Sequence, residues 1–430
     1  MASGYRTLWG LGVIRRRKVF STIGALGVIG LTVVLPVSSA DAVQADARPL
    51  VTIGTLRTVF GDPGATSPDD FGYAVARSGS GLGSIVVVGA SDANGTGAVY
   101  IYLKGSSGWP TTPTATLTDP AGISDDLFGY SVAASGNTIV VGADGTNSFA
   151  GAAYIYVKGP SGWPTVPTAT LADPTATTGD FFGYSVAVSE STAVIGTFGG
   201  NSTYNRRGAG YVYVKGSSGW PTTPTATLAA LDGTAHHGFG SSVAVSANTV
   251  VVGANGDYGS PGKAFIYVRG SSGWPTTPTV TLTAPAGTTS DNFGNSVAVS
   301  GNTVVVGAYG INSYAGAAYI YVSSSSGWPT KPTATLADRP VTPDEGFGYS
   351  VAVSGNTVVV GAPVTNSHTG AAFIYVRSTS VWPTNPTATL ADPPATTNDN
   401  FGNSVAASED TAVVGAYGTN SSEGAAYIYH

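Results

Sequence analysis

The chain of 430 residues contains no cysteine, only four histidines and only 10% charged residues. Without cysteine, the fold can use neither disulfides nor thiolate metal ligands. The spacings G-x-S-x-G, H-E-x-x-H and that of a P-loop are all absent, and the histidines do not recur at equivalent positions: His236, His237, His368 and His430. Because these patterns carry most recognisable catalytic chemistry, we predict that the protein is not an enzyme.

Glycine and apolar residues are abundant instead, with 60 glycines and an apolar share of 42%. A Phe-Gly pair recurs at Phe71, Phe128, Phe182, Phe239, Phe293, Phe347 and Phe401. The successive spacings are 57, 54, 57, 54, 54 and 54 residues, which makes seven units. Periods of this length with several strands per unit are typical of β-propellers or β-solenoids, because one unit cannot bury its own apolar face.

Each unit contains three short apolar runs separated by Gly, Asn and Ser, and the stretch 293–322 shows them clearly. Small residues dominate the first run, as in 349–354, so we expect it at the crowded axis of a propeller. The second run, as in 357–362, is apolar throughout and should be buried on both faces. A Gly-Asn pair between these runs predicts a tight hairpin, because Gly supplies the positive φ that such turns require.

A fourth strand should follow the segment Gly-Trp-Pro-Thr-x-Pro, because its prolines confine it to the edge of the blade. The last unit stops after its third strand. Residues 58–63 align with 115–120, and each of these segments lies shortly before a Phe-Gly pair. We therefore expect residues 49–62 to supply the missing outer strand and remove the exposed edge. The predicted fold is all-β: a seven-bladed β-propeller of four-stranded blades, closed by an N-terminal strand.

The N-terminus predicts export. Basic residues 15–18 precede an apolar run, and small residues follow, with cleavage expected after Ala42 or Ala47. Residues 1–42 then form a signal peptide, and 43–430 form one propeller domain; an uncleaved membrane anchor is the alternative. Removing 1–42 takes away five bases and one acid, so the balance becomes 13 minus 23, or −10. An acidic secreted body without a membrane span is a poor partner for nucleic acid.

Three motifs carry a family resemblance: Phe-Gly opening the unit, Val-Gly-Ala closing the second run, and Gly-Ala-Ala-Tyr-Ile-Tyr in the third. With these in tandem, the chain resembles FG-GAP repeat proteins, the family of integrin α-subunit propellers and of many secreted bacterial repeat proteins. The resemblance implies an extracellular or cell-surface module for adhesion and ligand binding. We therefore expect a secreted, monomeric binding module for a protein or glycan; a cell-envelope scaffold without a small ligand is the alternative.

The resemblance also implies calcium, because some units of the family carry an acid-rich loop between the second and third strands. Asp92, Asn94 and Thr96 are the best remnant of such a loop here. Calcium takes six to eight oxygens, including several carboxylates, so an Asx-turn is the competing interpretation and no cofactor is expected. Another acid recurs two residues before the Phe, and we expect it to accept backbone N–H groups: Asp69, Asp126, Asp180, Asp291, Glu345 and Asp399.

Six tryptophans occupy equivalent positions before the fourth strand: Trp109, Trp163, Trp220, Trp274, Trp328 and Trp382. Rings repeated around a rim could stack on sugars and make the protein a multivalent lectin. Alternatively, each ring covers the seam between two blades.

Overall fold

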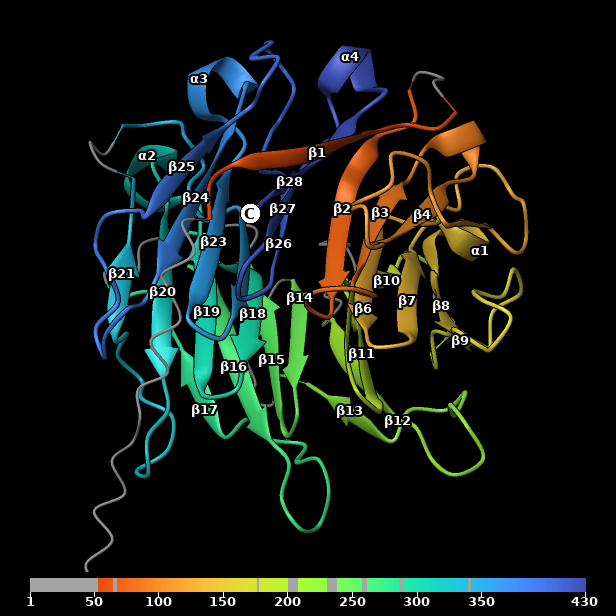
Figure 1. The fold of residues 1–430 in the computed structure, drawn as a ribbon. Coiled ribbons are helices and arrows are strands. Elements are labelled where there is room, and N and C mark those ends of the chain that lie inside the picture. The colour runs from red at the N-terminus through yellow and green to blue at the C-terminus, as the bar shows by residue number, and fades with distance from the viewer. Residues whose placement is uncertain are drawn as a thin grey trace, which may run out of the picture. The chain divides into compact units, whose positions relative to one another are not determined.

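The computed structural model describes residues 53–64, 68–175, 178–199, 208–229, 238–256, 261–285, 290–338 and 342–430. The predicted signal peptide, its cleavage sites and the histidine pair at 236–237 lie outside these residues. The described residues form seven four-stranded sheets, each antiparallel throughout (Figure 1). The predicted architecture, an all-β seven-bladed propeller, is therefore confirmed.

Each blade begins with an inner strand and continues outward. The inner strands are β2 (Phe71–Ser78), β6 (Ser131–Ser135), β10 (Phe182–Ser189), β14 (Phe239–Ser246), β18 (Phe293–Ser300), β22 (Ser350–Ser354) and β26 (Ser404–Ala407). The second strands are β3 (Ile85–Ala90), β7 (Thr138–Ala143), β11 (Thr192–Thr197), β15 (Thr249–Ala254), β19 (Thr303–Ala308), β23 (Thr357–Ala362) and β27 (Ala412–Ala416). Every inner strand contacts inner strands of the neighbouring blades, and β2 contacts β26, so the blades form a closed circle.

The outer half of each blade is equally regular. The third strands are β4 (Ala98–Leu103), β8 (Ala152–Val157), β12 (Ala209–Val214), β16 (Lys263–Val268), β20 (Ala317–Val322), β24 (Ala371–Val376) and β28 (Ala425–Tyr429). The outer strands are β5 (Ala115–Thr118), β9 (Ala169–Ala172), β13 (Ala226–Leu228), β17 (Val280–Leu282), β21 (Ala334–Leu336), β25 (Ala388–Ala391) and β1 (Leu56–Gly61). We number the blades 1 to 7 by their inner strands β2, β6, β10, β14, β18, β22 and β26.

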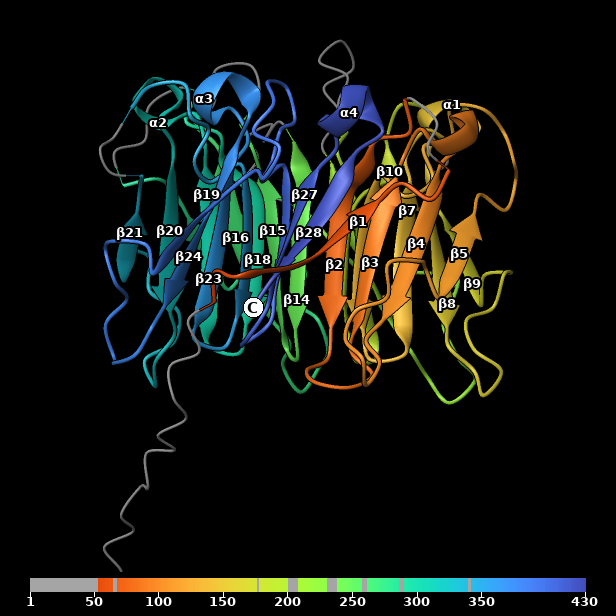
Figure 2. The ribbon, with the colours of Figure 1, turned by 45° about the horizontal axis from the view of Figure 1, so that its top comes forward.

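Short helical turns join second to third strands. They are η1 (Ala93–Gly95), α1 (Thr146–Phe149), α2 (Ile311–Tyr314), α3 (Thr365–His368) and α4 (Thr419–Ser422). The four α turns lie at one end of the blades in both ribbon views, and we call this end the upper face (Figure 2). The Gly-Asn hairpins lie at the opposite end, the lower face.

The core lies between successive blades. The second strands are fully buried, as predicted, because both of their faces pack against neighbouring sheets. The Phe of each Phe-Gly pair is also buried, and Phe182 is 0% exposed. The Gly that follows it has a positive φ, and a Cβ on Gly183 would lie 2.3 Å from the carbonyl oxygen of Ala152. Only glycine can therefore bring the chain this close to the preceding blade, which explains why Phe-Gly opens each unit.

Blade 7 is closed by the N-terminal strand, as predicted. β1 pairs antiparallel with β28, and the order of the sheet is β1, β28, β27, β26. The main chains of Thr55 and His430 exchange two hydrogen bonds at the start of this pairing, with N–O distances of 3.1 and 3.0 Å. Phe60 is 0% exposed and stacks on Tyr102 of blade 1, with ring centroids 3.8 Å apart. The edge that β28 would otherwise expose is thus covered.

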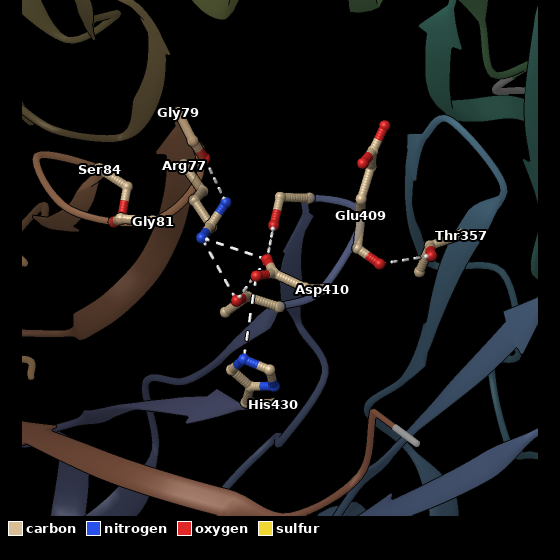
Figure 3. Close-up of polar contacts among 10 residues, drawn as sticks. Arg77, Gly79, Gly81, Ser84, Thr357, Glu409, Asp410 and His430 are labelled. Atoms are coloured by element: carbon tan, nitrogen blue, oxygen red, sulfur yellow. Dashed lines mark hydrogen bonds and ion pairs between the residues drawn. The ribbon is translucent and has the colours of Figure 1, made fainter. Parts of the chain in front are cut away.

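A polar cluster joins blades 7 and 1 at the lower face (Figure 3). The guanidinium of Arg77 lies 3.7 Å from the carboxylate of Asp410 and donates to the carbonyl oxygen of Gly79 at 2.6 Å. Burial alone would raise the pKa of Asp410, but hydrogen bonds from Ser408 and Thr411 and the charge of Arg77 bring it below its ordinary value. The Arg77 side chain is fully buried, so this ion pair is part of the interface between the blades.

Candidate functional site

A central channel runs along the inner strands and encloses a cavity of about 270 Å³. Three consecutive residues from every blade line it, beginning with the residue that follows the Phe-Gly pair. That first residue is tyrosine in four blades and serine or asparagine in three: Tyr73, Tyr130, Tyr184, Ser241, Asn295, Tyr349 and Asn403. The upper end of the channel is therefore lined by hydroxyl and amide groups on a β scaffold.

The channel tyrosines contact one another and a second layer of aromatic rings. Tyr130 lies between Tyr73 and Tyr184, with ring centroids 5.0 and 5.2 Å apart. Tyr73 also contacts Tyr417, and Tyr349 contacts Tyr309, at 5.5 and 5.3 Å. Tilted and edge-on ring pairs at these distances are attractive beyond their buried area, so the aromatic groups form two clusters at the mouth of the channel, one around Tyr130 and one around Tyr349.

One buried acid lies beside these rings. Asp144, directly after β7, is 3% exposed, and its Oδ1 atom makes no hydrogen bond. Burial raises the pKa of Asp144 to about 7, although main-chain N–H groups partly oppose the shift. Burial is also the main cause of the raised pKa of Tyr73 and Tyr130, to which the Asp144 charge contributes. Burial at the mouth of the channel thus favours the neutral forms of Asp144, Tyr73 and Tyr130.

The turns of the upper face present further aromatic side chains. In α1, Asn147, Ser148 and Phe149 all have φ between 53° and 64°, a left-handed conformation that is unfavourable for residues with a Cβ. The same conformation recurs in α2, α3 and α4. Asn at the first of these positions tolerates it best, which accounts for the recurring Asn-Ser. Phe149 and Tyr314 occupy the third position and are 42% and 47% exposed.

The calcium candidate is a short turn. Asp92 precedes η1, Asn94 within it has a φ of 53°, and the N–H of Gly95 donates to the carbonyl oxygen of Asp92 at 2.7 Å. Burial and the carboxylates of Asp125 and Asp69 raise the pKa of Asp92. Among the described residues, no three His, Cys, Asp or Glu side chains converge on a point where they could hold a metal. Calcium binding by Asp92, Asn94 and Thr96 therefore stays a prediction, without a preformed shell of carboxylates.

The six tryptophans lie after the third strands, near the lower face, and each packs against one of the clusters between blades. Trp220 and Trp382 are 8% and 3% exposed, whereas Trp109, Trp163, Trp274 and Trp328 are half-buried. Basic groups lie over three of the rings: Lys104 at 5.8 Å from Trp109, Lys215 at 6.0 Å from Trp220, and Arg377 at 4.9 Å from Trp382. Both interpretations of the tryptophans from the sequence therefore remain open. The rings cover seams between blades, and four of them also keep an exposed part that could contact a sugar.

Charge differs between the two faces. The residue after the third strand bonds through its N–H to the lower hairpin and is basic in five blades: Lys104, Lys158, Lys215, Arg269 and Arg377. The connections from outer to inner strands lie at the upper face and are acidic: Asp62, Asp69, Asp119, Asp126, Asp173, Asp180, Asp291, Asp338, Glu345, Asp392 and Asp399. Sequence reasoning missed this polarity and the channel tyrosines, although the residue after each Phe-Gly pair could have indicated the latter.

Comparison with known proteins agrees with this geometry. Six segments match the sequence profile of the FG-GAP repeat: 111–156, 166–214, 222–267, 276–321, 333–375 and 385–429. The first runs from just before the outer strand of blade 1 through the third strand of blade 2, and the others follow the same frame, so the sequence repeat is offset from the blade by one strand. No curated protein matches the chain. None of the helices in the described residues is long and apolar enough to span a bilayer. The matched segments cover more than half of the sequence, and the chain belongs to the FG-GAP repeat family.

Proposed function

We propose that the protein is a secreted, non-catalytic binding and adhesion module that contacts an extracellular protein or glycan through its upper face. FG-GAP propellers are typically non-catalytic interaction modules of extracellular proteins. The observation that carries the proposal is the exposure of Phe149 and Tyr314 on left-handed turns around the tyrosine-lined channel mouth.

Two physical arguments support the upper face. Aromatic side chains supply large contact area at low cost in conformational entropy, so exposed rings on a rigid frame suit recognition. Strained backbone at φ near 60° costs free energy in each turn, and such conformations concentrate at ligand-binding positions. Phe149 is supported by Phe181, with centroids 5.4 Å apart, and Tyr314 by Tyr309 at 6.1 Å. These rings are thus held in place before any partner arrives.

The proposal is tested by binding of the exported protein to glycan arrays and to proteins of its native surface. A variant carrying Phe149→Ser and Tyr314→Ser should lose at least tenfold in affinity for whatever the wild type binds. Val166→Ser is the matched control. Val166 is 72% exposed but follows Trp163 in the segment near the lower face, away from the proposed binding surface. Equal binding by the double variant and the control, or no binding by the wild type, would contradict the proposal; the latter result favours a structural scaffold.

A second function, multivalent binding of an anionic glycan, is favoured by the basic groups over the tryptophans. Lys104, Lys215 and Arg377 could pair with sulfate or carboxylate groups while the rings contact the sugar faces. Binding to an acidic polysaccharide should then weaken with salt and fall in the triple charge-reversal variant of these residues. Binding that neither salt nor the triple variant weakens would exclude the tryptophans and their basic neighbours as the glycan-binding site.

A further inference from the structure

Pairs of acidic residues lie at the upper face, where the outer strand of one blade leads to the inner strand of the next. The first acid follows the outer strand and the second comes seven residues later: Asp62 and Asp69, Asp119 and Asp126, Asp173 and Asp180, Asp338 and Glu345, and Asp392 and Asp399. Within several pairs the two carboxyl groups are close enough to shift each other's pKa. Five of the seven connections between blades thus carry two acidic residues.

The pair between blades 1 and 2 is buried with a hydroxyl group. Asp119, Asp126 and Thr146 are 7%, 2% and 6% exposed. Asp119 accepts the N–H groups of Ala121 and Ile123 at 3.2 and 3.0 Å. Neither Asp126 Oδ2 nor Thr146 Oγ1 completes a well-formed hydrogen bond, although the two side chains are near enough for Thr146 to affect the pKa of Asp126.

The pair between blades 6 and 7 repeats this arrangement. Asp392, Asp399 and Thr419 are 3%, 1% and 4% exposed. Asp392 Oδ1 and Thr419 Oγ1 again complete no well-formed hydrogen bond. Tyr427 lies beside this set as Tyr154 does beside the first, and its phenol interacts with both Asp392 and Thr419. Two distant parts of the chain therefore present the same four side chains, and in each set the threonine oxygen and one carboxylate oxygen complete no well-formed hydrogen bond. That carboxylate is the second acid of the first set and the first acid of the second set, in which Asp399 accepts the N–H and O–H groups of Thr396 at 3.1 and 2.5 Å.

These oxygens need a positive partner. Asp126 and Asp392 are almost fully buried, and each has a carboxylate oxygen that completes no well-formed hydrogen bond beside the other acid of its pair. Two adjacent buried carboxylates repel when both are ionised. Either a shared proton or a bound cation relieves this repulsion. The donors are carboxylate and hydroxyl oxygens without nitrogen or sulfur, which is the ligand chemistry of hard divalent cations.

Other connections of the same chain either complete the hydrogen bonds of the acid pair or lack some of its residues. Between blades 2 and 3, the hydroxyl of Thr175 lies 2.7 Å from Asp173 and 2.9 Å from Asp180, so it bridges the pair. Between blades 4 and 5, Ala284 stands in place of the first acid and Ile311 in place of the threonine. The first acid and the threonine are both absent here, whereas the connection into blade 1 keeps both acids, Asp62 and Asp69, with Ala93 in place of the threonine.

We propose that Asp119, Asp126 and Thr146, and likewise Asp392, Asp399 and Thr419, each bind a divalent cation of the calcium type. The cation links the connection between two blades to the turn that follows the second strand of the next blade. These two sites use other residues than the turn at Asp92, Asn94 and Thr96. The proposal is also independent of the partner-binding function, because its readout is the cation itself.

Titration of the full chain with Tb³⁺, a calcium substitute, tests the sites directly. Tyr154 and Tyr427 adjoin them, so excitation of tyrosine should sensitise terbium emission at about two ions per chain, and Ca²⁺ should displace it. Asp126→Asn combined with Asp399→Asn should abolish this emission. Asp291→Asn is the matched control from the connection that lacks the first acid and the threonine, and it should leave the emission unchanged.

Unfolding at pH 8 gives a second measurement. Millimolar Ca²⁺ should raise the Tm by about 5 °C over the value in chelator. If the double variant fails to fold, Thr146→Val with Thr419→Val should still weaken terbium binding at least tenfold. No sensitised emission together with a Tm that ignores Ca²⁺ would overturn the proposal, and a Tm that instead rises on acidification would assign a shared proton to each pair.

Discussion

Blade 7 is assembled from two distant parts of the chain, whereas each of the other six blades is one continuous segment. In blades 1 to 6 the third and fourth strands are joined by the segment that carries the tryptophan. In blade 7, β28 and β1 are held together without that segment. The comparison shows which contacts replace covalent continuity.

The replacements are a larger side chain and an ion pair. Phe60 stands where the continuous blades have leucine, such as Leu117 and Leu171, and it also contacts Trp109 edge-on at 6.4 Å. At the lower face, a serine hydroxyl and the N–H of the next hairpin link regular seams, as between Ser78 and Gly136 at 2.7 Å. The seam between blades 7 and 1 has the Arg77–Asp410 pair instead. The non-covalent junction is therefore more aromatic and more polar than the seams that it imitates.

Deletion of residues 49–62 should have the largest effect, because it uncovers the edge of β28 and removes Ile53 and Phe60 from the core. We expect loss of the cooperative thermal transition, measured by circular dichroism and calorimetry. A synthetic peptide of residues 49–62 should restore the transition, and a scrambled peptide should not. An unchanged melting curve would show that blade 7 does not depend on β1.

Phe60→Ala should destabilise the fold by about 3–5 kcal/mol, because it empties a fully buried site between blades 7 and 1. Phe60→Leu restores the residue type of the other blades and should cost about 1 kcal/mol. Urea unfolding measures both values. Equal losses for the two variants would mean that stacking on Tyr102, rather than volume, dominates the site.

The repeat made most of the frame predictable from sequence. Residues that recur seven times, such as Phe182 and Gly183, mark strand positions through periodicity alone. Closure by the N-terminal strand followed from the alignment of 58–63 with 115–120. These features depend on local composition, which a single sequence displays.

Features that depend on pairing across the ring were not predictable. Arg77 and Asp410 belong to opposite ends of the sequence, and neither recurs at its position in other units. The acid before each Phe was expected to accept backbone N–H groups, but its pairing with the acid seven residues earlier appears only in three dimensions. Sequence periodicity reveals what the blades share, and the candidate sites lie where they differ.

Asp410→Ala should cost about 2 kcal/mol, because it leaves the buried guanidinium of Arg77 without a counter-charge, and the partial exposure of Asp410 limits the loss. Arg77→Val, the residue type of blades 3 to 6 at this position, should cost less than 1 kcal/mol.

The pH dependence tests the same pair. The pKa of Asp410 is lowered in the folded protein, so its stabilisation is present above the pKa of the unfolded chain, near 4, and is lost as pH falls through the folded value. The difference in unfolding free energy between wild type and Asp410→Ala should therefore shrink at acidic pH. A constant difference would argue that lost packing, not charge, explains the variant.

The smallest effects should come from the lower hairpins, where blade 7 again differs. Ala247 has a φ of 49° at the position where Gly136, Gly301 and Gly355 have φ near 55°. Ala247→Gly should therefore stabilise the fold by about 1 kcal/mol, because glycine adopts this conformation without strain.

Glu409, at the first position of the blade 7 hairpin, does not have a positive φ. Glu409→Gly should therefore destabilise the fold by about 0.5–1 kcal/mol through the added entropy of the unfolded chain. Opposite signs in urea unfolding would confirm that the two hairpins differ in backbone geometry, whereas a common sign would mean that blade 7 ends in the same turn as the continuous blades.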